Sequence, residues 1–300
     1  MIDLSIKIGN LKLKNPVMLA SGTCGPEQAK FAKLEKIGAI ITKSVTLNPT
    51  IGNLPPRTTE TVGGMLNSIG LENPGTEKFI QDKLPDYLAL NTPVIVNVAA
   101  QSQEEYITVA RKLNDTDISG FEINVSCPNV KGLGVEFGKD PQVLEELTSK
   151  IRKATSKPII IKLSPNVTDI QPLAHAAENG GADAVSLINT LYGLKINLET
   201  KTPELGNITG GLSGPCIKPV ALYYVYKVAQ VCKIPVIGIG GIINYKDALE
   251  FLVIGASAIQ IGTANFFNPN TGPEIAAGIK NYCEQQGVKN IQELIGSRKF

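Results

Sequence analysis

The stretch PVIGIGGIINYKDALEFLVIGASAIQIGT, residues 235–263, decides the fold. It starts with a short apolar run, PVIGI (235–239), passes through an amphipathic segment at Lys246–Ile254 and returns to a second apolar run, AIQIG (258–262). Nearly continuous apolar runs of this length are typical of buried parallel strands, and the segment between them has the pattern of a covering helix. The stretch therefore predicts a β-α-β unit of an α/β protein.

The same alternation extends over the whole chain. Six more apolar runs precede this stretch: PVMLA (16–20), AIITK (39–43), PVIVNV (93–98), FEINV (121–125), PIIIKL (158–163) and AVSLI (184–188). Further amphipathic segments lie at Glu104–Leu113, Pro141–Ala154, Asp169–Asn179 and Lys218–Val231. Eight strands alternating with helices favour a single (β/α)8 TIM barrel, and an open doubly wound sheet is the alternative. Since no linker or repeat interrupts the chain, we expect one domain over residues 1–300.

Two connections are unusually long. One runs from Ser44 to about Pro93, and the other runs from Asn189 to about Pro219. Long ordered connections in a compact domain usually cover or line a site. We therefore expect both at the C-terminal face of the barrel.

Charge and cysteine content exclude several classes of function. The 29 Lys and Arg residues nearly balance the 27 Asp and Glu residues and are scattered, so we expect no nucleic-acid or membrane-surface binding. The five cysteines have no metal-ligand spacing, which predicts a reducing compartment, no metal site and no iron–sulfur cluster in this chain. No apolar run reaches the roughly 18 residues of a membrane span, and no signal peptide is recognisable, so we expect a cytoplasmic protein.

Polar residues and glycines collect at the ends of the predicted strands. In a barrel of this type the loops at these ends converge on one face, where active sites lie. The pattern therefore predicts a site formed by residues far apart in sequence. These residues are Ser21, Lys43, Asn97, Asn124, Lys162, Asn189, Gly240, Gly241, Gly262 and Thr263.

The last two strand ends predict a phosphate site. Gly238-x-Gly240-Gly241 and Gly262-Thr263 would let backbone N–H groups approach an anion, although glycines that only form tight turns are the alternative. Lys162 ends a buried strand, where it either forms a structural salt bridge or stabilises a reduced flavin. Lys43 is compatible with binding a phosphate, a carboxylate or ribityl oxygens, and also with a Schiff base.

The segment NVSCPN (124–129) has the clearest chemical signal. Asn124 and Ser126 should point to the same side of a strand, and Pro128 would present Cys127 at the barrel mouth. A buried, inert cysteine is the alternative, but the polar neighbours favour a working thiol. The single histidine, His175, falls on an outer helix, so a histidine-based triad is unsupported. Cys216, Cys232 and Cys283 fall near helices and are interpreted as packing residues.

Over nearly its whole length the sequence resembles the dihydroorotate dehydrogenases, and most of all the catalytic subunit of the NAD-linked, two-subunit class (class 1B). The motifs that carry the resemblance are TKSVTLNP (42–49), MLNSIGLENPG (65–75), NVSCPNVKG (124–132), IKLSPNVTDI (161–170), SLINTLYG (186–193), TGGLSGPCIKPVAL (209–222), IGIGGI (237–242) and GASAIQIGTANF (255–266). The resemblance implies FMN-dependent oxidation of (S)-dihydroorotate to orotate in de novo pyrimidine biosynthesis.

The resemblance also implies a role for each matching residue, with Cys127 as the catalytic base. Substrate contacts would come from Lys43, Asn67, Ser68, Ile69, Gly70, Leu71, Asn124, Asn189 and Thr190. FMN contacts would come from Ser21, Lys43, Ser44, Asn97, Asn124, Lys162, Ile188, Gly214, Gly240, Gly241, Gly262 and Thr263. One departure is Ala100-Gln101, where relatives more often have glycine and serine.

The resemblance further implies a homodimer that binds an electron-transfer subunit, giving a heterotetramer. FAD and a [2Fe–2S] centre would lie in that subunit, and NAD would be the final acceptor. The alternatives are a fumarate-linked enzyme of class 1A, a non-catalytic flavin-binding protein, and a phosphosugar aldolase or isomerase that uses Lys43 or Lys162 as a Schiff base.

Overall fold

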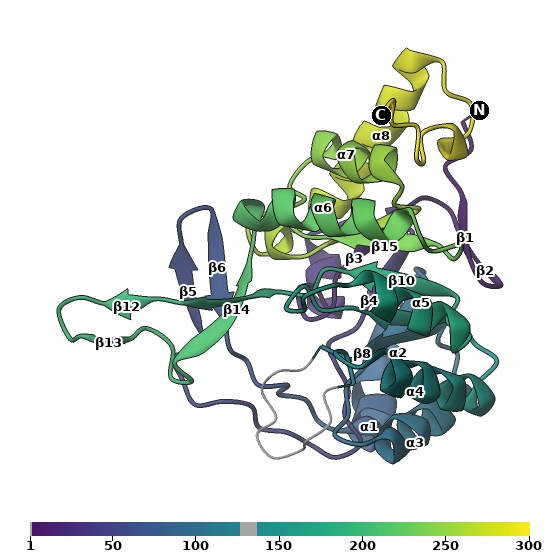
Figure 1. The fold of residues 1–300 in the computed structure, drawn as a ribbon. Helices are drawn as coiled ribbons and strands as arrows, with labels where there is room; N and C mark the ends of the chain where they lie inside the picture. Colours follow the sequence, from purple (N-terminus) through teal and green to yellow (C-terminus); the bar gives the residue numbers. More distant parts are fainter. Residues whose placement is uncertain (1, 127–136) are drawn as a thin grey trace.

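The computed structural model describes residues 2–126 and 137–300, and eight parallel strands in it form a closed barrel (Figure 1). The order around the barrel follows the sequence, and β10 closes it by pairing with both β9 and β15. The prediction of a TIM barrel is therefore confirmed, and the open sheet is excluded. The strands are β3 (Val17–Leu19), β4 (Ala39–Ile41), β7 (Val94–Val98), β8 (Gly120–Asn124), β9 (Ile159–Lys162), β10 (Ala184–Leu187), β15 (Val236–Ile239) and β16 (Ala258–Ile261).

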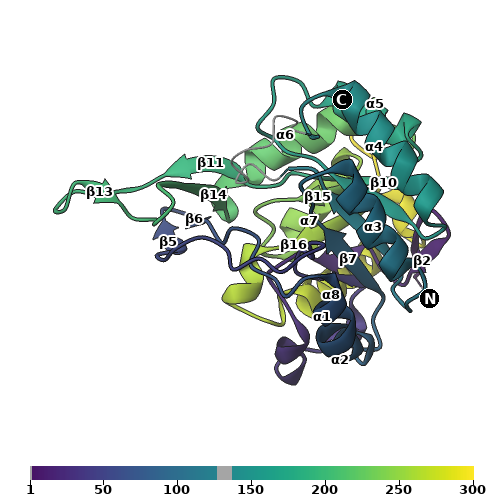
Figure 2. The same cartoon turned by 90° about the horizontal axis from the view of Figure 1, so that it is seen from below.

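Helices cover the outside of the barrel, as Figure 2 shows from a second direction. The five predicted helices are present within two residues of their expected bounds: α3 (Gln103–Asn114), α4 (Pro141–Ala154), α5 (Gln171–Asn179), α6 (Lys218–Ala229) and α7 (Tyr245–Ile254). The sequence analysis did not identify α8 (Thr271–Gln286), nor the continuous helical segment formed by α1 (Thr76–Lys78), a π-helical turn (Phe79–Lys83) and α2 (Leu84–Leu88).

The close packing of α7 on the barrel depends on a glycine inside a strand. A Cβ atom on Gly238 of β15 would lie 2.4 Å from Cδ1 of Phe251, which is fully buried on α7. Gly238 therefore makes room for a helix, because any side chain there would displace the aromatic ring. Gly238 of the predicted phosphate motif therefore has a packing role. Only Gly240 and Gly241 of that motif line the cavity described below.

The two long connections form an antiparallel sheet, here called the extension sheet, that projects to one side of the barrel (Figures 1 and 2). Its order is β11-β14-β6-β5, and β6 pairs with β14, so the two connections hydrogen-bond to each other. Its strands are β5 (Thr58–Thr61), β6 (Gly64–Asn67), β11 (Leu191–Leu194) and β14 (Thr209–Ser213). The short strands β12 (Ile196–Asn197) and β13 (Thr202–Pro203) extend it further.

A small hairpin, β1 (Ile6–Ile8) and β2 (Leu11–Leu13), precedes the barrel. Inward-facing side chains of both strands are buried and belong to the main hydrophobic core. Within residues 2–126 and 137–300, no helix combines the length and the apolar character that crossing a membrane would require.

Candidate active site

A cavity of about 910 Å³ lies between the C-terminal ends of the barrel strands and the extension sheet. Residues from both sources line it: strand ends such as Lys162 and loop glycines such as Gly262 share it with Met65 and Gly211 of the extension sheet. The predicted site residues that line it are Ser21, Lys43, Ser44, Asn67, Ile69, Gly70, Leu71, Asn124, Lys162, Ile188, Asn189, Thr190, Gly214, Gly240, Gly241, Gly262 and Thr263.

Two of the described predicted site residues, Ser68 and Asn97, do not line the cavity. Cys127 lies outside the described residues. Ser68 is buried, and its hydroxyl oxygen accepts a hydrogen bond of 2.8 Å from Nδ2 of Asn53. Asn97 is fully buried beneath the cavity wall rather than exposed on it. The departure at Ala100 and Gln101 also lies away from the wall, where the N–H of Gln101 bonds to Glu105.

The Lys162 side chain is almost completely buried, and its ammonium group has a carboxylate partner. Nζ of Lys162 lies 3.5 Å from Oε1 of Glu122, a residue with no exposed surface. The predicted structural salt bridge is therefore present, yet Lys162 also lines the cavity. The salt-bridge and flavin interpretations of Lys162 are therefore compatible, because its carboxylate partner lies inside the barrel while the lysine itself also borders the cavity.

Asn97 connects the cavity wall to the same carboxylate. Its Nδ2 donates to Oε1 of Glu122 at 2.7 Å, while its Oδ1 accepts from the hydroxyl of Ser44 at 2.6 Å. Both ends of the amide are thus occupied, and its orientation is fixed. Ser44 itself lines the cavity, so Asn97 supports a wall residue from below.

Asn124 is held in place at the end of β8. Its Oδ1 accepts hydrogen bonds from Nδ2 of Asn189 at 3.3 Å and from the N–H of Ser126 at 3.2 Å. The hydroxyl of Ser126 donates to the backbone carbonyl of Lys162, and the hydroxyl of Tyr106 donates to that of Asn124. These bonds fix the chain directly before Cys127, since they engage residues 124 and 126.

The glycine loops after β15 and β16 pass close to the cavity. Gly240 and Gly241 have φ values of +132° and +72°, and a Cβ atom on either would lie 2.7 Å from a side-chain carbon of α6. Around Gly262 the nearest atom to such a Cβ, on Ala20, is 3.8 Å away, so that space belongs to the cavity. Backbone that borders a cavity on glycine loops suits a phosphate, which supports the fit of these residues to FMN.

The segment 67–71 contributes Asn67, Ile69, Gly70 and Leu71 to the cavity wall. Gly70 and Leu71 both have positive φ values, +76° and +60°, so the backbone turns sharply here. The buried Asn73 anchors the end of the turn: its Nδ2 donates to the carbonyl of Leu71, and its Oδ1 accepts from the N–H groups of Thr46 and Gly75. Side-chain bonds of Asn73 therefore fix the end of the turn, in addition to backbone bonds such as that from the N–H of Asn53 to the carbonyl of Ile69.

Several wall residues were not found from the sequence. Asn166 donates to the carbonyl of Thr190 and accepts from the N–H of Tyr192, which joins the loop after β9 to the extension sheet. Its position in IKLSPN, two residues after a polar Ser164, was an available signal. Others lie on the extension sheet or in the last loop: Thr58, Thr59, Glu60, Met65, Thr209, Gly210, Gly211, Ser213, Phe266 and Phe267.

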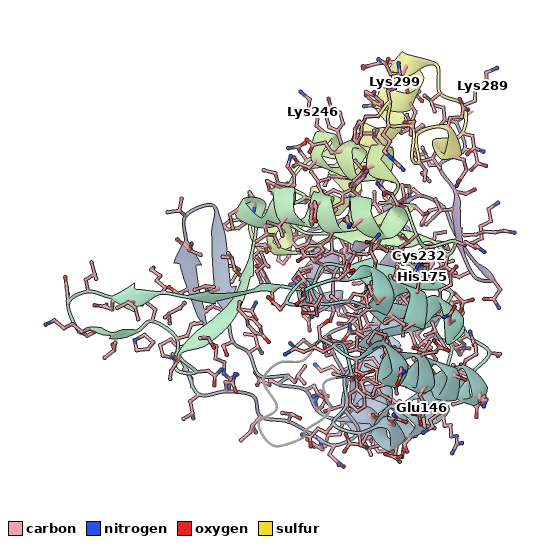
Figure 3. All side chains as sticks on the ribbon, in the orientation of Figure 1. Glu146, His175, Cys232, Lys246, Lys289 and Lys299 are labelled. Carbon is pink, nitrogen blue, oxygen red and sulfur yellow. The ribbon has the colours of Figure 1, made fainter. Side chains whose placement is uncertain are left out.

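His175 and the described cysteines do not line the cavity. His175 on α5 is half exposed, with Nδ1 3.9 Å from Glu178, which agrees with the predicted outer position (Figure 3). Cys283 is buried and Cys232 partly buried, as expected of packing residues, but the same expectation is wrong for Cys216, which is exposed after β14. Across the described parts of the chain, no group of three or more His, Cys, Asp or Glu residues could hold a metal ion.

Comparison with known proteins identifies relatives that all belong to one family. The family model described as dihydroorotate dehydrogenase matches residues 3–283. The chain is 53% identical over 298 residues to the dihydroorotate dehydrogenase B (NAD(+)) catalytic subunit of Geotalea uraniireducens, covering 98% of each chain. It is 54% identical to the protein of the same name from Geotalea daltonii, covering 99% of each, and 51% identical to that from Thermoanaerobacter pseudethanolicus, again covering 99% of each.

A solved structure shares the fold. The crystal structure of the dihydroorotate dehydrogenase of Eimeria tenella in complex with ferulenol superimposes with a TM-score of 0.81. The match covers 98% of this chain and 88% of the other, at 23% sequence identity. It supports the barrel architecture described above.

Proposed function

Because the chain belongs to the dihydroorotate dehydrogenase family, we propose that it is the catalytic subunit of an NAD-linked enzyme that uses FMN to oxidise dihydroorotate to orotate in pyrimidine biosynthesis. The observation that carries this proposal is the single cavity that brings together strand-end lysine, asparagine and glycine residues with the turn at 67–71. No one segment of the chain contains these groups. The barrel and the extension sheet have to fold together to produce them.

FMN would supply the oxidant, accepting a hydride equivalent from the substrate. Gly240, Gly241, Gly262 and Thr263 would hold its phosphate, because their backbone borders the cavity at the ends of β15 and β16. Lys162 would lie beside the ring, where a positive charge favours the reduced state. The further contacts that we propose for FMN are Ser21, Lys43, Ser44, Asn97, Asn124, Ile188 and Gly214, with Asn97 acting through Ser44.

The substrate would lie between FMN and the turn at 67–71. Amide groups of Asn67, Asn124 and Asn189 offer both donors and acceptors, which match the amide groups of a dihydropyrimidine ring. Lys43 and the backbone of Ile69, Gly70 and Leu71 would bind the substrate carboxylate. Thr190 lies on the same wall, and Ser68 would act from behind it because its hydroxyl faces Asn53.

Cys127 would act as the base that removes a proton from the substrate carbon next to the carbon being oxidised. The hydrogen bonds of Asn124 and Ser126 would position the chain that leads into it. An unperturbed thiol has a pKa of about 8.5, so the rate should rise from neutral to alkaline pH as the thiolate forms.

The relatives are named catalytic subunits, which implies that a second subunit passes electrons to NAD. We propose that this subunit carries FAD and a [2Fe–2S] centre and that two copies of each chain form a heterotetramer around a catalytic homodimer. This part of the proposal is tested by the mass of the complex isolated with its partner and by its iron and flavin content.

Anaerobic titration of the purified chain with dihydroorotate tests the reaction itself. The expected result is a yellow protein whose absorbance near 450 nm bleaches as orotate forms. A colourless chain, or a yellow chain that does not bleach, would contradict the proposal. Adding fumarate or NAD with and without the partner subunit then separates this class from the fumarate-linked class, since NAD should reoxidise FMN only when the partner is present.

A further inference from the structure

Side chains from four barrel strands meet at one buried carboxylate beneath the cavity, that of Glu122 on a fifth strand, β8. Its Oε2 accepts hydrogen bonds from Nε2 of Gln260 on β16 at 2.6 Å and from the hydroxyl of Ser186 on β10 at 3.0 Å. Its Oε1 accepts from Asn97 on β7 and faces Lys162 on β9. Since β8 and β16 are not neighbours, these contacts cross the interior of the barrel.

We call the group formed by Glu122, Gln260, Ser186, Asn97 and Lys162 the polar layer. Such a layer is costly in a barrel core, which is normally filled by branched apolar side chains. A buried carboxylate has to be paired and hydrogen-bonded to be tolerated, and exchanging such a pair for apolar residues is often neutral or stabilising. Glu122 is fully buried and Lys162 almost fully, so solvent screens their interaction little. The layer is therefore better explained by what Lys162 and Ser44 do in the cavity than by stability.

We propose that Glu122 is a positioning residue that sets the flavin potential by compensating the charge of Lys162 and aligning Asn97 beneath Ser44. The proposal rests on the proposed function, because it assumes that Lys162 lies beside FMN. With Glu122 in place, part of the lysine charge is neutralised from below. Without it, the full charge acts on the ring and favours the reduced state.

Glu122→Gln is the decisive variant, because it removes the charge while keeping the shape. The site can accommodate the new amide: Oε1 of Gln260 is buried without a hydrogen-bond partner among the described residues, and rotating that amide would let it accept from the introduced NH2 group. The expected result is that the equilibrium constant for two-electron reduction of FMN rises about tenfold, which is a shift of about +30 mV. The full-length chain with FMN bound is measured by equilibration with redox dyes.

Two further variants separate charge from packing. Glu122→Asp keeps the charge but leaves a small void, so a charge role predicts a potential closer to wild type than that of Glu122→Gln, whereas a packing role predicts the reverse order. In a Lys162→Met background, Glu122→Gln should shift the potential much less than in wild type, because the charge that it compensates is absent. Equal shifts in both backgrounds would overturn the proposal.

If Glu122→Gln loses FMN, retention or loss of FMN by Glu122→Asp decides between the charge role and the packing role. Retention of FMN by Glu122→Asp would then support the charge role, and loss from both variants would overturn it in favour of packing. A wild-type chain that binds no FMN would instead refute the proposed function. A wild-type chain that binds FMN and bleaches, with an unchanged potential in Glu122→Gln, would refute only the role of Glu122.

Discussion

The ammonium group of Lys218 lies 2.7 Å from Oδ1 of Asp247, and this ion pair joins the start of α6 to the start of α7. The other carboxylate oxygen of Asp247 accepts from the N–H groups of Ile243 and Asn244. The loop that contains Gly241 is therefore fixed from both sides, because a Cβ on Gly241 would also meet Lys218.

Asp247→Asn should loosen this loop, because it removes the charge that Lys218 faces. We expect the free energy of unfolding to fall by about 1.5–3 kcal/mol, the range for hydrogen bonds to charged groups, together with weaker FMN binding. Glu250→Gln is the matched control, since Glu250 bonds to the same lysine at 3.0 Å but is half exposed, and it should cost less than about 1 kcal/mol. Thermal unfolding and FMN titration measure both.

The same pair predicts a pH dependence at the alkaline end. The hydrogen bond from Lys218 to Asp247 raises the pKa of the lysine above 10.5. Its contribution to stability is therefore complete below pH 10.5 and is lost as the pH rises through the raised pKa. The stability difference between wild type and Asp247→Asn should stay constant from pH 7 to 9 and shrink above pH 10.5. A difference that vanished near neutral pH would contradict this.

Gly262→Ala should separate folding from cofactor binding. Nothing closer than 3.8 Å would meet the new methyl group inside the protein, so stability should change by less than about 1 kcal/mol. The methyl group would point into space that we assign to FMN, so affinity for FMN should fall about tenfold or more. Gly240→Ala is the comparison, because its positive φ and the contact with Ala221 should reduce both properties. Unchanged FMN affinity in Gly262→Ala would contradict the assignment.

Asn73→Ala should weaken substrate binding, although Asn73 is not itself one of the proposed substrate contacts. The variant leaves the N–H groups of Thr46 and Gly75 and the carbonyl of Leu71 without their partner, which should cost about 1–3 kcal/mol of stability. The turn at 67–71 would then be less ordered, so KM for dihydroorotate should rise while bound FMN is retained. Asn179→Ala on the exposed surface of α5 is the control and should leave KM unchanged.

Cys127→Ala tests the proposed base. Loss of a general base commonly lowers the rate by about 10²–10⁴-fold, and FMN should remain bound because the contacts proposed for its phosphate are other residues. Cys127→Ser should recover part of the rate at high pH. Stopped-flow reduction of FMN by dihydroorotate measures this step directly, and near-wild-type reduction in Cys127→Ala at pH 7 would refute the assignment.

The described cysteines should differ sharply in reactivity. Burial raises the pKa of Cys24 to about 11 and that of Cys232 to about 12, and it also raises the pKa of the buried Cys283. Their thiolate fractions at pH 8 should be negligible, whereas Cys216 is exposed. In a Cys127→Ser background a disulfide reagent should therefore label one thiol quickly, and Cys216→Ser should abolish that fast phase.

The barrel could be predicted because its strands are mainly apolar on both faces and polar or glycine residues recur at or just beyond their C-terminal ends. The extension sheet could not, because its strands lack that pattern. β14 (TGGLS) contains two glycines, and β5 (TTET) has no large apolar residue. These segments become strands through pairing between distant parts of the chain, such as Leu66 with Leu212, which no local propensity encodes.

The candidate site was predictable to a similar extent. Strand-end residues such as Lys162 were found because the fold places all strand ends on one face. Glu122 was missed, although a charged residue in the middle of the apolar run FEINV was a visible signal. Its significance depends on partners such as Gln260, which lies 138 positions away in the chain. Cys216 does fall beside a helix, in the 3-10 helical turn Pro215–Ile217 that leads into α6, but it was misassigned as a packing residue because its side chain is exposed there.

The pairing of β6 with β14 has a consequence for how this architecture can diversify. The two long connections hydrogen-bond to each other, while the proposed cofactor contacts come mostly from the ends of the barrel strands. Mutations in these two connections would change which ring-shaped molecule is accepted and would leave the proposed FMN contacts of the barrel intact. Descendants of such a barrel could acquire new substrates by exchanging a single structural module.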